Sequence, residues 1–151
     1  ITLVLFFVPY GLITAELGTD GLFPTAAQLA EHGETVLRGP ASRVTTILGA
    51  ARALASGELV LDVGMPADEF TARLVALPGI GPWTAGYLAM RVLGNPDVLL
   101  TSDLVIRQSA SALGLPSSPG ALAEHGSRWA PWRSYVGLHL WRSRPTGTIR
   151  A

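Results

Sequence analysis

The sequence contains no cysteine and no lysine. Without cysteine, the chain can form neither a disulfide nor a zinc–thiolate or iron–sulfur centre. Without lysine, it has no side-chain amine that could form a Schiff base with a substrate. The eleven basic residues are therefore all arginines, and they equal the eleven acidic residues in number, so that the formal net charge is zero. A neutral chain is not typical of proteins that bind nucleic acid strongly and without specificity.

The charge is unevenly distributed along the chain. No acidic residue follows Glu124, whereas five arginines do: Arg128, Arg133, Arg142, Arg144 and Arg150. This excess predicts a basic face near the C-terminal end of the domain, with a solvated tail as the alternative.

Long apolar runs are also scarce, and the most apolar stretch is residues 1–15. A membrane-spanning helix needs about 20 such residues, and Pro9 and Gly11 interrupt this run. It also lacks the positive flank of a secretory signal. We therefore expect no membrane contact, and we treat residues 1–21 as an apolar segment of unclear assignment, most simply a buried helix.

Apolar residues recur at helical spacing, and no segment alternates with period two for long. The short apolar stretch 98–100 fits a connector better than a strand. The 151 residues correspond to about one domain, and the sequence predicts that its fold is all-α. A capping box at Thr25 and Gln28 is expected to open the first helix, which ends at about His32. The helix that begins at Pro66 is expected to have a buried stripe of Phe70, Leu74 and Leu77. The other expected helices and the end of this one follow from the same start and stop signals: 40–57, 66–76, 82–92, 104–113, 119–129 and 132–142.

The chain is organised around residues 77–85, which read L-P-G-I-G-P-W-T-A. Pro78 and the two glycines, Gly79 and Gly81, should end one helix, because glycine adopts backbone angles that other residues avoid. Pro82 suits the first turn of the next helix, where its missing N–H is not needed. The N-terminus of that helix presents free N–H groups that suit an anion such as phosphate. The alternative is a plain loop between two packed helices.

This hairpin resembles the helix-hairpin-helix of the DNA glycosylase superfamily, which reads L-P-G-[IV]-G-x-x-T-A and is followed by an essential aspartate. Asp103 stands at that place here. The G-P-W-T-A of the hairpin and the later block W-x-P-W-R-S-Y…L-H-x-W over 129–141 are similar to the alkylbase branch, of the DNA-3-methyladenine glycosylase II type. The resemblance implies a glycosylase domain over 22–144, followed by a tail, 145–151. Family members normally carry further helices before position 22, so a truncated N-terminus is one alternative.

The resemblance gives Asp103 the role of the catalytic aspartate. Its position alone indicates only the N-cap of the following helix, a role that Thr101 or Ser102 could also fill. The two roles are compatible, because a helix N-terminus favours an ionised carboxylate. Such a carboxylate can stabilise the positive charge that develops on the sugar when the N-glycosidic bond breaks, and can orient or deprotonate water.

Trp83 and Tyr87 lie four residues apart, on one face of the helix that follows the hairpin. Aromatic residues at this spacing usually belong to a core, but the resemblance assigns both, with Trp141, to a base pocket. Alkylated purines are cationic, and aromatic ring faces attract cations. A flipped base would stack among these three rings. Arg142 stands where close relatives often carry a further aromatic residue, and a cation there could weaken this preference.

The hairpin itself is expected to hold DNA. By the resemblance, backbone N–H groups and one hydroxyl bind a phosphate; they belong to Gly79, Ile80, Gly81 and Thr84. Backbone carbonyls on the other side of the hairpin bind a monovalent cation; by position they belong to Val75, Leu77 and Ile80. No other cofactor is expected.

The sequence thus predicts a monofunctional DNA glycosylase that hydrolyses the N-glycosidic bond of alkylated purines in base-excision repair. Water is the nucleophile, because no lysine is present for lyase chemistry. The expected partner is double-stranded DNA containing alkylated bases, and the protein is expected to be a monomer in the cytoplasm of bacterial type, associated with the nucleoid. The alternatives are a non-catalytic or truncated helix-hairpin-helix DNA-binding module and a glycosylase for a neutral lesion. No residue is recognisable that would fill the space left by a flipped base.

Overall fold

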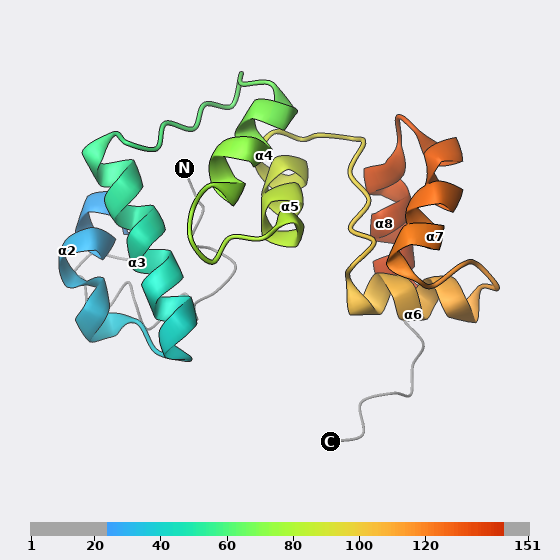
Figure 1. Ribbon diagram of the computed structural model, residues 1–151, viewed down its shortest axis with the longest axis horizontal. Helices are drawn as coiled ribbons and strands as arrows, with labels where there is room; N and C mark the ends of the chain where they lie inside the picture. Colours follow the sequence, from blue (N-terminus) through green and yellow to red (C-terminus); the bar gives the residue numbers. More distant parts are fainter. Residues whose placement is uncertain (1–23, 144–151) are drawn as a thin grey trace. The chain divides into compact units, whose positions relative to one another are not determined.

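The computed structural model describes residues 24–143. These residues form seven α-helices and one 3₁₀ helix, and none of them lies in a strand, which confirms the predicted all-α fold (Figure 1). Both the apolar segment 1–21 and the tail 145–151 lie outside the described residues. The helices are α2 (Ala26–Val36), α3 (Ala41–Ser56), α4 (Ala67–Val75), α5 (Pro82–Val92), α6 (Leu104–Ala112), α7 (Pro119–Gly126), the 3₁₀ helix η1 (Ser127–Trp129) and α8 (Arg133–Arg142).

The chain divides into two compact units. Within the described residues, the first unit consists of 24–65 together with Ala72–Gly81, and the second of Pro66–Thr71 together with 82–143. Helix α4 therefore contributes to both units. No helix in the described part of the chain is long and apolar enough to cross a membrane.

In the first unit, α2 and α3 pack side by side (Figure 1). The capping box is confirmed: the Gln28 amide donates to Thr25 Oγ1 at 3.2 Å, and the Thr25 amide donates to Gln28 Oε1 at 2.9 Å. Helix α2 continues to Val36, past the expected end near His32, because Gly33 lies in the helix contact. A Cβ at Gly33 would meet Leu48 Cδ2 at 2.6 Å, so its absence lets α3 come close. The core of this unit consists of Leu29, Val36, Leu37, Leu48 and Ala51.

The turn between α4 and α5 contains the predicted hairpin. Helix α4 ends at Val75 and α5 begins at Pro82, as the punctuation of the sequence predicts to within one residue. Gly79 has a φ of 85°, and a Cβ there would lie 2.0 Å from Thr46 Oγ1. Gly81 does not have a positive φ, and the position of its Cβ would be open space. The expectation of unusual backbone angles is thus confirmed at Gly79 and wrong at Gly81.

The buried stripe expected on α4 is only partly correct. Phe70 and Leu74 are fully buried, whereas Leu77 lies beyond the end of the helix and is half-buried. The helix ends at Val75, so Leu77 leaves the 3.6-residue periodicity that would have aligned it with the other two.

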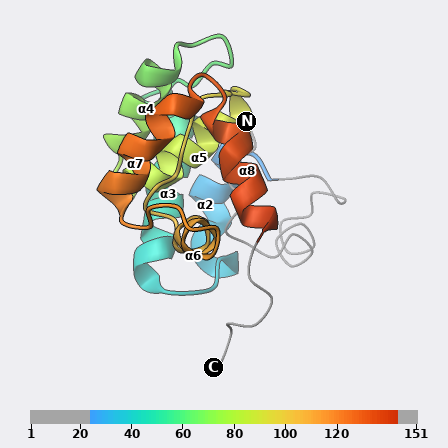
Figure 2. The same cartoon turned by 90° about the vertical axis from the view of Figure 1, so that its right-hand side faces the viewer.

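The second unit is built from the start of α4 and from α5 to α8. In both views α7 and α8 lie above α6 (Figures 1 and 2). The stretch 98–100 is a connector that lies in neither a helix nor a strand, as expected, and Leu100 is buried. The helix expected over 119–129 ends at Gly126 and continues as the 3₁₀ helix η1. The core consists of Leu100, Ile106, Ala110, Leu122 and Leu140.

Candidate active site

Asp103 is the N-cap of α6. Its Oδ1 accepts a hydrogen bond from the Ile106 amide at 2.9 Å, and its backbone is extended. Ile106 is almost completely buried in the core. The residue that donates to the Asp103 carboxylate is therefore itself held in place by core packing. Asp103, rather than Thr101 or Ser102, therefore provides the cap.

Two indole N–H groups donate to the same carboxylate. Trp83 Nε1 lies 3.1 Å from Asp103 Oδ2, and Trp141 Nε1 lies 3.0 Å from Oδ1. Trp83 comes from the first turn of α5 and Trp141 from the last turn of α8. The half-buried carboxylate thus accepts three N–H hydrogen bonds, one each from α5, α6 and α8. N–H donors of this kind stabilise its negative charge and fix its orientation.

The third predicted pocket residue, Tyr87, lies between the two indoles. Its ring is stacked on Trp83, with centroids 5.4 Å apart and planes 7° apart, and it meets Trp141 edge-on at 5.8 Å. Burial raises the pKa of Tyr87 above its ordinary value, and the charge of Arg91 opposes this shift. The structure therefore brings together Asp103 and all three aromatic residues that the sequence assigned to the pocket.

The stacking constrains where a base could bind. The ring centroids of Trp83 and Tyr87 are separated by the distance expected for a stacked aromatic pair in direct contact. No base therefore fits between these two rings. All three rings also pack against the core of the second unit. Core packing and proximity to Asp103 thus occur together at these rings.

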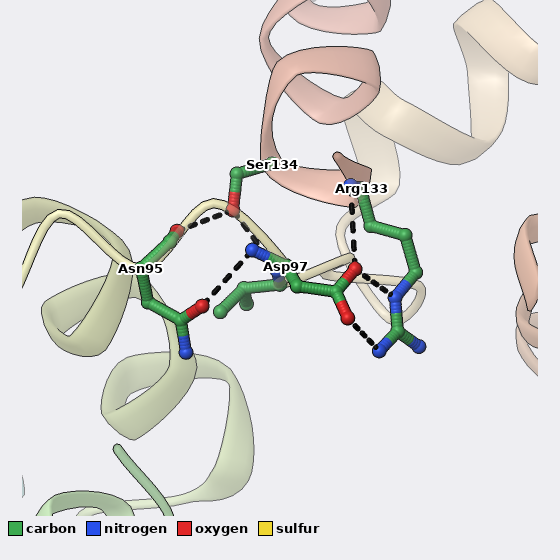
Figure 3. A network of polar contacts seen from close by, with 5 residues as sticks. Asn95, Asp97, Arg133 and Ser134 are labelled. Atoms are coloured by element: carbon green, nitrogen blue, oxygen red, sulfur yellow. Dashed lines mark hydrogen bonds and ion pairs between the residues drawn. The ribbon is translucent and has the colours of Figure 1, made fainter. Parts of the chain in front are cut away.

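A polar network that sequence analysis missed lies where α8 begins, and we call it the polar clamp: Asn95, Asp97, Arg133 and Ser134 (Figure 3). Arg133 Nε lies 2.5 Å from Asp97 Oδ1, and Arg133 Nη2 lies 2.7 Å from Asp97 Oδ2. Ser134 Oγ donates to the Asn95 carbonyl at 2.8 Å and accepts from the Val98 amide at 2.9 Å. The hydrogen bonds from Arg133 hold the pKa of Asp97 below its usual range, and Asp97 raises the pKa of Arg133.

The sequence predicts that Arg133 belongs to a basic face, but its charge is neutralised by Asp97. The other described arginines of this group, Arg128 and Arg142, are exposed. Arg144 and Arg150 lie outside the described residues. Of the three described arginines in this group, Arg133 is therefore ion-paired and the other two are exposed.

The hairpin residues are divided between the units. Gly79, Ile80 and Gly81 belong to the first unit, and Thr84 belongs to the second. The Ile80 amide, which was expected to bind phosphate, donates to the Leu77 carbonyl at 3.1 Å. Among the described residues, no group of three or more histidines, aspartates or glutamates could hold a metal ion, a finding that does not bear on carbonyl ligands.

Comparison with known proteins gives relatives of one kind, although no family model matches the sequence. Over 119 residues the chain is 48% identical to the "Probable bifunctional transcriptional activator/DNA repair enzyme AlkA" of Mycobacterium tuberculosis, an alignment that covers 79% of this chain and 24% of that protein. Over 122 residues it is 33% identical to DNA-3-methyladenine glycosylase 2 of Escherichia coli K12, covering 79% of this chain and 42% of the relative. The chain therefore spans less than half the length of these relatives.

Two solved structures share the fold. A DNA-3-methyladenine glycosidase from Bacillus halodurans superposes with a TM-score of 0.72 at 28% identity, over 91% of this chain and 66% of the other. A 3-methyladenine DNA glycosylase from Schizosaccharomyces pombe, solved in complex with abasic DNA, gives a TM-score of 0.76 at 24% identity, over 87% of this chain and 68% of the other.

Proposed function

We propose that this chain, which belongs to the alkylbase branch of the helix-hairpin-helix DNA glycosylase superfamily, carries the base-excision site of a DNA-3-methyladenine glycosylase. The family resemblance predicted from the hairpin is confirmed by the similarity to the mycobacterial and E. coli relatives. Because the chain spans only 24% and 42% of those relatives, its activity, substrate and partner are all part of this proposal. The reaction is hydrolysis of the N-glycosidic bond of an alkylated purine in duplex DNA, without strand cleavage.

The observation that carries the proposal is the carboxylate of Asp103, held by three N–H donors beside an aromatic cluster. Each carboxylate oxygen offers about two lone-pair sites. Oδ1 accepts from Ile106 and Trp141, whereas Oδ2 accepts from Trp83, so one site on Oδ2 remains when the described residues are counted. We assign this site to the reaction.

At this site the bond between the sugar carbon and the base nitrogen breaks, and its electron pair leaves with the base. The positive charge left on the sugar is stabilised by the fixed Asp103 carboxylate. Water then adds to the sugar carbon and loses a proton to the carboxylate or to solvent. The alkylated purine carries a positive charge before cleavage, so it is also the better leaving group.

The base must leave the duplex to reach Asp103. In the proposal, it stacks on an outer face of the cluster of Trp83, Tyr87 and Trp141, whose rings attract a cationic base by about 0.5–2 kcal/mol more than a neutral one. Arg142 follows Trp141 directly and is exposed, so solvent weakens the repulsion between its charge and such a base.

The hairpin is proposed to anchor the DNA backbone. Gly81 leaves open space at its Cβ position, which permits close approach of a phosphate to its own backbone, and Thr84 lies in the first turn of α5. The carbonyls of Val75, Leu77 and Ile80 remain candidate ligands of a monovalent cation. Leu77 accepts one hydrogen bond from the Ile80 amide, and a carbonyl has a second lone pair for a cation.

The test is base release from duplex DNA that contains a single N-alkylpurine, under single-turnover conditions with the full chain. The parent chain should release the free base and leave an intact strand with an abasic site. Asp103→Asn keeps the shape of the N-cap, since asparagine caps helices about as well as aspartate, but it removes the charge and should release no base. Release by Asp103→Asn at the parent rate would remove Asp103 from this role. Binding of abasic duplex by a parent chain that releases no base would instead favour the non-catalytic module.

A further inference from the structure

Helix α8 is tied at two places to the connector that leads to Asp103. Near the start of the helix, the polar clamp joins Arg133 and Ser134 to residues 95–98. Near its end, Trp141 donates to Asp103. Arg133 and Trp141 are separated by about 12 Å of helix at 1.5 Å per residue. The clamp and the bond from Trp141 to Asp103 therefore lie at opposite ends of α8.

The clamp restricts both sliding and rotation of α8. The guanidinium of Arg133 makes two parallel hydrogen bonds to the two oxygens of Asp97, a planar arrangement that tolerates little displacement. Ser134 is 4% exposed, and its hydroxyl is donor to Asn95 and acceptor from Val98. Its amide also donates to the Pro96 carbonyl at 2.8 Å. Each residue from Asn95 to Val98 thus has a directional contact with the start of α8, and Figure 3 shows those of Asn95 and Asp97.

The remaining contacts of α8 are mainly apolar. Leu140 is buried in the core of the second unit, and a Cβ at Gly137 would only reach ordinary contact with Ile106 and Leu99. Apolar burial is non-directional, so it holds α8 in place without setting its axial position to a fraction of an ångström. The 3.0 Å bond from Trp141 to Asp103 needs that precision, since hydrogen bonds weaken steeply with distance and angle.

We propose that Asp97, Arg133 and Ser134 are positioning residues: they set the axial position of α8 at which the Trp141 indole reaches Asp103. The catalytic consequence of this inference depends on the proposed function, but the geometric part does not. A clamp that only stabilises the fold would instead loosen the whole unit when it is removed.

The first experiment measures solvent exchange of the indole N–H groups by NMR in the full chain without DNA. Arg133→Lys keeps the charge but loses the two-pronged geometry, and Ser134→Ala removes the buried hydroxyl. In both variants, exchange at Trp141 should rise by about tenfold, while exchange at Trp83, whose indole bonds the same carboxylate from α5, should stay within about twofold. The matched control is Arg52→Lys, which alters an exposed ion pair with Glu34 in the first unit and should change neither.

Two results of this experiment would overturn the proposal. Unchanged exchange at Trp141 in the folded variants would show that the clamp does not position the indole. An equal rise at Trp83 and Trp141 would show that it acts on the stability of the unit instead. If Arg133→Lys does not fold, Ser134→Ala decides between the same outcomes.

The second experiment is a double-mutant cycle on single-turnover base release. Arg133→Lys should lower the rate by about tenfold, equivalent to about 1.4 kcal/mol, with affinity for the duplex within about twofold of the parent. In a Trp141→Phe background, which already lacks the indole N–H, the same substitution should lower the rate no further. Equal losses in both backgrounds would contradict positioning through Trp141. If the parent chain releases no base, the proposed function fails, and the exchange measurement still decides the positioning role.

Discussion

At the scale of single residues, Trp141 has two separable parts. Its indole N–H donates to Asp103, and its ring meets Tyr87 in the aromatic cluster. A substitution that removes the whole side chain therefore changes both the hydrogen bonding of the Asp103 carboxylate and the proposed base-binding surface. The charge preference proposed for this surface can be measured only when these two contributions are separated.

Two substitutions of Trp141 achieve this separation. Trp141→Phe keeps a ring but removes the N–H, so release of a cationic N-alkylpurine and of a neutral base such as hypoxanthine should fall by similar factors. Trp141→Leu also removes the ring face, so the ratio of the cationic-base rate to the neutral-base rate, which Trp141→Phe leaves unchanged, should fall by up to the roughly 30-fold that 2 kcal/mol of cation–π attraction provides. The measurement is the ratio of single-turnover rates on the two duplexes. A ratio that is equal in the Phe and Leu variants would mean that the ring acts by shape alone.

The two glycines of the hairpin also differ at this scale. Gly79→Ala places a Cβ against Thr46 at a positive φ, and the backbone strain alone is about 1–2 kcal/mol. The free energy of unfolding in urea should fall by at least this amount, and Thr46→Ala should recover part of the loss. Gly81→Ala meets no neighbour and should leave stability nearly unchanged, so it is the variant that tests phosphate binding. Weaker binding to every duplex by Gly81→Ala would support the anchor, whereas loss of discrimination between damaged and normal DNA alone would contradict it.

At the scale of helices, the contact between α8 and the connector should make stability depend on pH. The pKa of Asp97 is lowered in the folded chain by its hydrogen bonds from Arg133, so below the ordinary aspartate pKa of about 3.9 the unfolded chain binds the proton first. Stability contributed by Asp97 is therefore complete above about pH 4 and is lost as the pH falls through the lower, folded pKa.

Urea unfolding at a series of pH values from about 5 to 2 would measure this dependence. The slope of unfolding free energy against pH in the acid range should be smaller in Asp97→Asn than in the parent chain. Glu34→Gln, which breaks the exposed pair with Arg52, is the control for loss of a surface ion pair, which contributes little to stability. Identical slopes for Asp97→Asn and the parent would contradict the assignment.

The helices also show which features could be predicted from the sequence. The capping box at Thr25, the cap at Asp103 and the end of α3 at Gly57, with a φ of 79°, depend on residues within one or two turns, so local rules identify them. Family resemblance supplied the set of aromatic residues around Asp103. The ion pair between Asp97 and Arg133 joins residues 36 positions apart, and no local pattern distinguishes a paired arginine from a solvated one. The length of α2 was missed for the same reason, because its last turn is stabilised by contact with α3.

At the scale of the whole molecule, the balanced charge sets an expectation for DNA binding. The formal net charge is zero, and Arg133 is already paired with Asp97. Affinity for duplex DNA should fall with salt through counterion release, but less steeply than for a strongly basic protein. Fluorescence anisotropy between low and physiological salt would measure the slope, and Arg128→Gln should reduce it by about one ion if that exposed arginine contacts a phosphate. A flat titration would count against DNA as the ligand.

The chain passes more than once between its two units, which limits how recombination between related genes can exchange them. The chain leaves the first unit at Pro66, returns to it at Ala72 and leaves it again at Pro82. Neither unit is therefore a continuous piece of sequence, and the boundary at residue 72 falls inside α4. A single crossover between two related genes, wherever it falls between residues 65 and 82, leaves at least one unit with sequence from both parents. Exchange of one complete unit between relatives requires three coordinated crossovers, one of them between residues 71 and 72 within α4, so the two units are expected to diverge together rather than as independent modules.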